Sequence, residues 1–328
     1  MRSIFLAPAL ALFIVFLAPL GQAQAADIDL FIEDISFKSV QPIANQTVKI
    51  IVRGKYVGDA PLTMNLGIDN VAFAHSDFKQ ESSPDFGSAV KPSVAYPLNS
   101  GSLFDYIFVG KFTSGGVKDL VFKIDGINNL IESNENNNLF NQRVTVLGSG
   151  DLIKITGDPA IYRIGSGGEK HLFVNGSTFW SYYTGNWSNI RLNNQAVFIK
   201  TLSQAAFDSI GIGKNMLVKT GARLIRFQNS SRIYTVFEMG NLKIITDEMG
   251  SRWYGTKWKE KVVTIQNSFE SNYTRDDDWD FIDSDDDGLS DIIERNIYFT
   301  DPYLADTDGD SYGDGVEVLN NYNPNFYN

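Results

Sequence analysis

The sequence DSDDDGLSDIIE, from Asp283 to Glu294, places carboxylates at its first, third, fifth, ninth and twelfth positions and a glycine at its sixth. The sequence DTDGDSYGDGVE, from Asp306 to Glu317, repeats every one of these carboxylates, with Ser311 in place of the glycine. Calcium takes roughly six to eight oxygen ligands, which a short loop supplies by turning alternate carboxylates inward and adding a bidentate glutamate. The spacing therefore predicts two calcium loops, with Ca²⁺ as the cofactor.

Each loop is expected to bind through alternating aspartates, one backbone carbonyl, a later aspartate acting directly or through water, and the final glutamate. Gly288 suits the sharp turn of the first loop, because glycine takes positive φ without a steric penalty. Ser311 occupies that position in the second loop, which we therefore expect to be strained and weaker. The expected metal ligands are Asp283, Asp285, Asp287, Leu289, Asp291 and Glu294 in the first loop, and Asp306, Asp308, Asp310, Tyr312, Asp314 and Glu317 in the second.

The acidity of the chain is confined to the same region. From Asp276 onward, the sequence contains sixteen Asp and Glu residues and one basic residue, Arg295, which gives a net charge of −15. The whole chain has a net charge of −11. Residues 1–275 are therefore mildly basic, and the tail carboxylates would repel one another without a cation. We expect calcium to be structural and to fold the tail; an acidic, solvated tail is the alternative.

The N-terminus has the pattern of an export signal. Arg2 precedes an apolar run from Ile4 to Leu20, and Ala23-Gln24-Ala25 follows. This pattern predicts a signal peptide over residues 1–25, with an uncleaved membrane anchor as the alternative. The chain has no cysteine and no second long apolar run. We expect a bacterial protein that is secreted or held at the cell surface, with no transmembrane segment after cleavage.

Residues 27–147 consist of short segments of alternating apolar and polar residues, separated by Gly, Asn and Asp, which predicts a β-sandwich. The segment Ile124-Asp125-x-x-Asn128-x-Leu130-x-Glu132-Ser133-Asn134-Glu135-x-Asn137-Asn138 resembles the closing hairpin of cell-adhesion-related bacterial immunoglobulin-like (CARDB-type) domains. The resemblance implies an adhesive or spacer module. We expect the Asn and Glu side chains to bond backbone groups of the hairpin; a further calcium site there is the alternative.

An internal repeat follows residues 148–150, Gly-Ser-Gly, which predict a flexible linker. Within residues 151–270, Leu152-Ile153-Lys154 and Ile161-Tyr162 realign, at an offset of 72, onto Leu224-Ile225-Arg226 and Ile233-Tyr234. Each copy, about 151–200 and 222–268, predicts a β-meander and then a short helix, with N-caps at Ser177 and Asp247. The pattern resembles uncharacterised repeats of secreted bacterial proteins.

The repeats are rich in aromatic and basic residues. Trp180, Trp187, Trp253 and Trp258, with neighbouring tyrosines, form either the cores of the repeats or platforms for sugar rings. Between Lys214 and Lys261, ten Lys and Arg oppose four Asp and Glu. This basic face is expected to be solvated, to meet an anionic wall polymer or to dock the acidic tail. An exported acidic chain is not expected to bind nucleic acid.

The sequence lacks the common catalytic constellations. It contains His75 and His171 as its two histidines, no cysteine, no G-x-S-x-G and no H-E-x-x-H. We expect no enzyme activity. A glycosidase is the alternative, because pairs of carboxylates leave no sequence signature.

Residues 276–328 contain both calcium loops. Paired EF-hands need a helix ahead of each loop, which the residues before Asp283 do not offer, and dockerins favour aspartate at the twelfth position. The loops and the Thr300-Asp301-Pro302 connector resemble instead the bacterial thrombospondin type 3 repeat. The resemblance implies a calcium-dependent structural module.

The predicted fold class is multidomain and mainly β: an Ig-like sandwich, two tandem meander/helix repeats and a calcium-loop tail with short helices. The expected function is that of a secreted calcium-binding surface, adhesion or extracellular-matrix protein. The expected partners are calcium, a cell-surface glycan or anionic wall polymer, and a surface protein. The alternatives are a polysaccharide- or cell-wall-binding accessory module and a dockerin-like assembly module.

Overall fold

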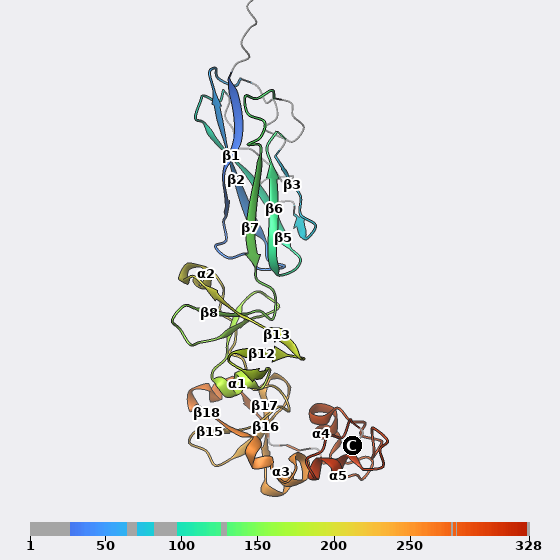
Figure 1. Ribbon diagram of the computed structural model, residues 1–328. Coiled ribbons are helices and arrows are strands. Elements are labelled where there is room, and N and C mark those ends of the chain that lie inside the picture. Colours follow the sequence, from blue (N-terminus) through green and yellow to red (C-terminus); the bar gives the residue numbers. More distant parts are fainter. Residues whose placement is uncertain are drawn as a thin grey trace, which may run out of the picture.

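The computed structural model describes residues 27–63, 71–81, 97–125, 130–276, 278–279 and 281–326. The expected signal peptide lies outside these residues. A β-sandwich, two small β-rich repeats and a tail of short helices follow one another along the chain (Figure 1). The multidomain, mainly β fold class expected from the sequence is confirmed.

The N-terminal unit is an Ig-like sandwich of two antiparallel sheets. In the first sheet, β2 (Val48–Gly58) lies between β1 (Ile28–Phe37) and β5 (Leu103–Phe112), and β4 (Phe78–Gln80) borders β5. The second sheet has the order β3-β6-β7, formed by β3 (Ala72–Phe73), β6 (Gly116–Lys123) and β7 (Leu139–Val146).

The alternation of β2 explains why the two sheets pack together. Val48, Ile50 and Val52 point to one face and are at most 2% exposed, within the same core as Leu120 and Phe122 of β6. Burial of one such side chain contributes roughly 1.5–3 kcal/mol. The period-two pattern in the sequence therefore corresponds to a single apolar layer between the sheets.

The two repeats share one architecture, a three-stranded meander followed by a helix. The meanders are β8 (Leu152–Ile155), β9 (Tyr162–Ile164) and β10 (Lys170–Leu172), and β15 (Leu224–Phe227), β16 (Ile233–Val236) and β17 (Asn241–Ile245). The helices are α1 (Gly176–Trp180) and α3 (Asp247–Tyr254). A 3₁₀ turn, η2 (Glu238–Gly240), joins β16 to β17.

Each repeat also has a return strand that the sequence did not predict. β14 (Ile199–Leu202) runs parallel to β8, and β18 (Val262–Ile265) runs parallel to β15. The first repeat reaches its return strand through β11 (Thr184–Asn186), β12 (Asn189–Leu192) and β13 (Gln195–Val197), whereas the second uses only η3 (Trp258–Lys261). α2 (Gln204–Asp208) follows the first return strand; η4 (Asn267–Asn272) and β19 (Thr274–Arg275) follow the second.

The predicted N-caps of the helices are wrong by one or two residues. Asn175 caps α1, because its side chain accepts a hydrogen bond from the backbone N–H of Thr178, and Thr246 caps α3 by accepting from Met249. Both caps have extended backbones, whereas Ser177 and Asp247 already lie within the first helical turn.

Residues 148–150 are held in place and do not form the flexible linker expected from their composition. The Gly148 N–H donates to the Asp151 carboxylate at 2.8 Å, and the Gly150 N–H donates to the Ile164 carbonyl at 2.8 Å. Leu147, before the segment, shares an apolar core with Ile153 after it. The sandwich and the first repeat are therefore joined by packed side chains.

The tail contains α4 (Asp291–Ile293), the π-helical turn η5 (Glu294–Tyr298) and α5 (Asp314–Leu319). α5 packs against α3 of the second repeat. Leu289, Ile293 and Val318 of the tail are buried in one apolar core with Trp253 and Tyr254. The tail is thus an extension of the second repeat.

Candidate metal centre

The first acidic loop gathers the three alternating aspartates. Asp283, Asp285 and Asp287 each offer a carboxylate oxygen, and these oxygens lie within 4.8 Å of one another. Each aspartate also accepts a backbone N–H of its own loop: Asp283 from Gly288 at 3.1 Å, Asp285 from Asp287 at 3.2 Å, and Asp287 from Leu289 at 2.7 Å. These bonds wrap the backbone around the carboxylates.

The second loop repeats this geometry. Asp306, Asp308 and Asp310 again bring three carboxylate oxygens within 4.8 Å of one another. Their acceptor bonds come from Ser311 at 2.9 Å, from Asp310 at 3.0 Å and from Tyr312 at 3.0 Å. The sequence repeat is therefore a structural repeat at the level of single hydrogen bonds.

The glutamates at the twelfth positions are buried beside these loops. Glu294 is 0% and Glu317 is 2% exposed. Burial, chiefly, and the nearby carboxylates of Asp285 and Asp287 raise the pKa of Glu294 to about 7. Such a carboxyl is costly to ionise unless a positive charge compensates it.

Several oxygens at the predicted ligand positions lack a protein partner. Among the described residues, the buried side-chain atoms without a hydrogen-bond partner include Asp283 Oδ1, Asp285 Oδ2, Glu294 Oε2 and Asp308 Oδ2. Buried polar atoms are nearly always paired in folded proteins, so a cluster of bare carboxylate oxygens fits a bound cation. An all-oxygen donor set is the one that hard divalent cations prefer.

The aspartates at the ninth positions have a different arrangement. Asp291 accepts both the N–H and the hydroxyl of Ser284 at 2.9 Å, and also bonds Arg295 at 2.8 Å. Asp314 accepts the N–H of Thr307 at 2.9 Å and its hydroxyl at 2.7 Å. Both carboxylates hold the second residue of their loop, which is a positioning role that the sequence analysis did not foresee.

The residues at the seventh positions were expected to donate backbone carbonyls. The side chain of Leu289 is 0% exposed in the core shared with the second repeat, whereas Tyr312 is 59% exposed. Ligation by the two carbonyls stays a prediction.

The two loops contact each other. The N–H of Gly315, at the start of α5, donates to the Asp287 carboxylate of the first loop at 2.7 Å. A Cβ atom on Gly315 would lie 2.3 Å from the Asp287 carbonyl oxygen, so glycine is required at this contact. Burial, chiefly, and the Asp285 carboxylate raise the pKa of Asp314 despite its bonds to Thr307. The loops therefore form one electrostatic unit.

Two basic residues of the second repeat contact the acidic tail. Arg252 donates to the Gly288 carbonyl at 2.6 Å and lies 3.6 Å from the Asp283 carboxylate. Lys243, whose side chain is 8% exposed, pairs with Asp276 at 3.1 Å and bonds the Asp278 carbonyl. Part of the basic face thus docks the chain's own tail, one of the uses considered from the sequence.

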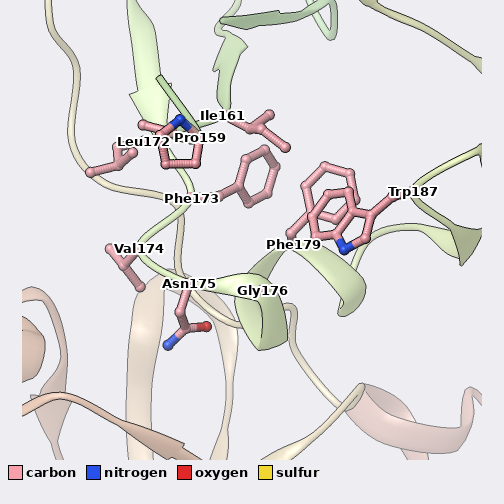
Figure 2. Close-up of a pocket in the computed structure, with 10 residues that line it drawn as sticks. Pro159, Ile161, Leu172, Phe173, Val174, Asn175, Gly176, Phe179 and Trp187 are labelled. Carbon is pink, nitrogen blue, oxygen red and sulfur yellow. The ribbon is translucent and has the colours of Figure 1, made fainter. Parts of the chain in front are cut away.

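The aromatic residues differ between the repeats. Trp253, Tyr254 and Trp258 are at most 5% exposed and form the core of the second repeat. They are therefore not available as a sugar platform. In the first repeat, Trp187 is 58% exposed beside the pocket of Figure 2.

The closing hairpin of the sandwich uses its polar side chains as expected. Glu132 is 8% exposed and accepts the Leu30 N–H of β1 at 2.5 Å. Glu135 accepts the Glu132 N–H at 3.0 Å, and Asp125 accepts the Leu130 N–H at 3.0 Å. The Glu132 bond attaches this segment to β1 at the edge of the first sheet, and the other two bonds hold the segment itself.

Both histidines have local partners. The Nδ1 atom of His171 lies 2.6 Å from the Lys214 carbonyl, and its Nε2 lies 3.1 Å from Glu169. The Nδ1 atom of His75 accepts the Asp77 N–H at 3.2 Å. The bond of His171 to Lys214 joins two segments distant in the sequence, whereas the contacts with Glu169 and Asp77 are local.

Comparisons with known proteins include two solved structures that are similar to part of the chain. No protein-family model matches the chain, and no curated protein matches it. A CARDB domain from Pyrococcus furiosus, crystallised in complex with di-metal ions, is 16% identical, covers 38% of this chain and 96% of its own, and has a TM-score of 0.25. A solution structure of the same domain gives 18% identity, 37% and 96% coverage, and a TM-score of 0.24. The helices of the described residues are too short or too polar to span a membrane.

Proposed function

We propose that this chain is a secreted calcium-binding surface or matrix protein in which calcium has a structural role. The proposal depends on one observation: buried carboxylate oxygens without a protein partner lie at predicted ligand positions of both loops. Because the tail shares a core with the second repeat, a cation bound there would stabilise more than the tail itself.

The chemistry of the loops favours calcium over magnesium. Calcium accepts a flexible shell of roughly six to eight oxygens, including bidentate glutamate, whereas magnesium demands near-ideal octahedral geometry and usually retains several waters. Each loop combines three clustered aspartates with one buried glutamate. Extracellular calcium modules bind at roughly 10⁻⁴–10⁻³ M, which suits a structural ion outside the cell.

Calorimetry and proteolysis of the secreted chain test the calcium proposal. Calcium is expected to bind with measurable heat and to protect residues 281–326 from protease, and magnesium at equal concentration is expected to protect less. Asp285→Asn and Asp308→Asn, one in each loop, should each weaken one site, while Asp301→Asn in the connector should not. Absence of both heat and protection in the unaltered chain would overturn the proposal.

Adhesion and a non-catalytic role belong to the same proposal. The Ig-like sandwich and the packed repeats are suited to hold binding surfaces at a distance from a cell surface, and both histidines are engaged in hydrogen bonds. The chain is expected in the medium or on the surface of its cells. Turnover of any glycan by the purified protein would contradict the non-enzyme assignment.

A further inference from the structure

The first repeat contains an apolar pocket of about 360 Å³ beside α1 (Figure 2). Pro159, Ile161, Phe173, Phe179 and Trp187 line it. In Figure 2 the Phe173, Phe179 and Trp187 rings and the side chains of Pro159 and Ile161 surround a common space, and the Asn175 side chain points away from it. The pocket is therefore apolar on the sides that would face a ligand.

The second repeat shows what occupies the corresponding place. Ile161 lies opposite Phe173 in the first meander, and Ile233 lies opposite Ile245 in the second. Ile161 therefore corresponds to Ile233, and Phe173 corresponds to Ile245. The N-caps Asn175 and Thr246 then align Phe179 with Gly250 and Trp187 with Trp258.

The two repeats differ at this helix position, where the first has Phe179 and the second has Gly250. In the second repeat, a Cβ atom on Gly250 would lie 2.5 Å from the Trp258 ring, so this indole rests on the bare helix and is 4% exposed. In the first repeat, the helix carries the buried Phe179 at this position, and its ring packs against Trp187 with ring centroids 5.0 Å apart and a tilt of 30°. Trp187 is 58% exposed, and Ile161 and Phe173 line an open pocket, whereas the corresponding Ile233 and Ile245 pack in one core with the Trp258 indole.

A second indole enters the same repeat from a different segment. Trp279 of the tail lies 4.9 Å from the Trp253 ring and 5.9 Å from the Phe237 ring, between ring centroids. Its ring N–H donates to the Ile244 carbonyl at 2.8 Å. The chain therefore already contains an example of a tryptophan from outside a meander docking onto it.

We propose that the pocket of the first repeat binds a single aromatic side chain, such as an indole, presented by a partner protein. Its volume and its aromatic walls suit one flat apolar ring. A sugar ring fits less well, because its hydroxyls need several polar partners and the Asn175 side-chain oxygen already caps α1. This site is independent of calcium.

The test is an NMR titration of the mature chain, in calcium, with N-acetyl-tryptophanamide as the probe. We expect shifts confined to Phe173, Phe179 and the Trp187 indole N–H, with a dissociation constant on the order of 1 mM for so small a ligand. Trp187→Ala removes one wall, and Gly176→Phe places a bulky ring at the lining of the pocket, at a position where a Cβ atom meets nothing within 4 Å. Each is expected to weaken binding at least tenfold.

Phe198→Ala is the matched control, since Phe198 is 78% exposed and does not line this pocket. It should leave binding unchanged. An unaltered affinity in Gly176→Phe would overturn the assignment of the site. Shifts of the same residues by methyl β-glucoside or cellobiose, without shifts by the aromatic probe, would overturn the assignment of the ligand class.

Discussion

Two backbone positions in each acidic loop take positive φ, and the two loops have their glycine at different positions. In the first loop these positions are Asp286, with φ of 60°, and Gly288, with φ of 105°. In the second they are Gly309, with φ of 76°, and Ser311, with φ of 81°. Each loop thus has one glycine and one residue with a side chain, so the loops are more equal than the missing glycine suggested. The calcium-loop sequence pattern has glycine at the sixth position alone, so it could not show that Gly309, at the fourth position, takes positive φ in the second loop.

Ser311→Gly should tighten calcium binding at the second loop by about two- to fivefold. Relief of left-handed strain contributes roughly 1–2 kcal/mol, which exceeds the roughly 0.5–1 kcal/mol entropy cost of glycine. Asp286→Gly is the matched change in the first loop and should gain less, because aspartate tolerates this conformation better. Calcium titrations followed at the Gly288 and Gly309 amide signals would separate the loops. A larger gain from Asp286→Gly would contradict this account.

Glu132 should make the sandwich hairpin sensitive to pH. Burial raises its pKa from an ordinary 4.5 to about 7, despite the bond from the Leu30 N–H. Because this carboxyl binds its proton more tightly in the folded state than in the unfolded state, the folded state loses stability as the pH rises from about 4.5 to about 7. The difference across this range is on the order of 3 kcal/mol.

Hydrogen exchange of residues 130–138 at pH 5 and pH 8 would measure this effect. Protection should fall at the higher pH, after correction for the intrinsic exchange rate. Glu132→Gln should flatten the dependence, and Glu33→Gln, on the exposed side of β1, should preserve it. Protection that increases with pH in the unaltered chain would refute the assignment.

At the scale of elements, the sequence predicted the parts that carry strong periodicity. The alternation of β2 and β5, the two meanders and the spacing of the acidic loops all correspond to observed structure. The return strands β14 and β18 were missed because four residues are too few to define a period, and their partners lie far away in the sequence. Residues 148–150 were misjudged because composition alone does not show that Leu147 and Ile153 share a core.

Gly250→Ala should destabilise the second repeat by roughly 1–3 kcal/mol. The added methyl would lie 2.5 Å from the Trp258 ring, within a core that has no room for it. We expect Trp258 to move outward, toward the arrangement of Trp187, with a red shift in fluorescence and a lower denaturation midpoint. Gly176→Ala is the control, because nothing lies within 4 Å of the added atom. Equal stability of the two variants would refute this explanation.

At the scale of the whole molecule, neighbouring units are joined through side chains. The Lys219 N–H at the start of the second repeat donates to the Ser181 hydroxyl at the end of α1, at 3.0 Å. The Tyr298 hydroxyl of the tail donates to the Trp253 carbonyl at 2.7 Å. Such joints favour cooperative unfolding of adjacent units.

Removal of calcium should therefore loosen the second repeat together with the tail. Hydrogen exchange with and without a chelator should show lost protection in β15–β18 as well as in residues 281–326. The sandwich provides the internal control, because it has its own core at the other end of the chain (Figure 1). Loss confined to the tail would show that the shared core is not energetically important.

If the chain is exported as proposed, the shared core also bears on the order in which its parts fold. Leu289, Ile293 and Val318 are synthesised after the second repeat, so that repeat lacks part of its interior until they have been made. With the proposed calcium dependence, the low calcium concentration of the cytoplasm would leave the second repeat and the tail incompletely folded and suitable for threading through a translocation channel. Calcium outside the cell would then complete folding, and the same ion that stabilises the protein would confine its mature form to the exterior.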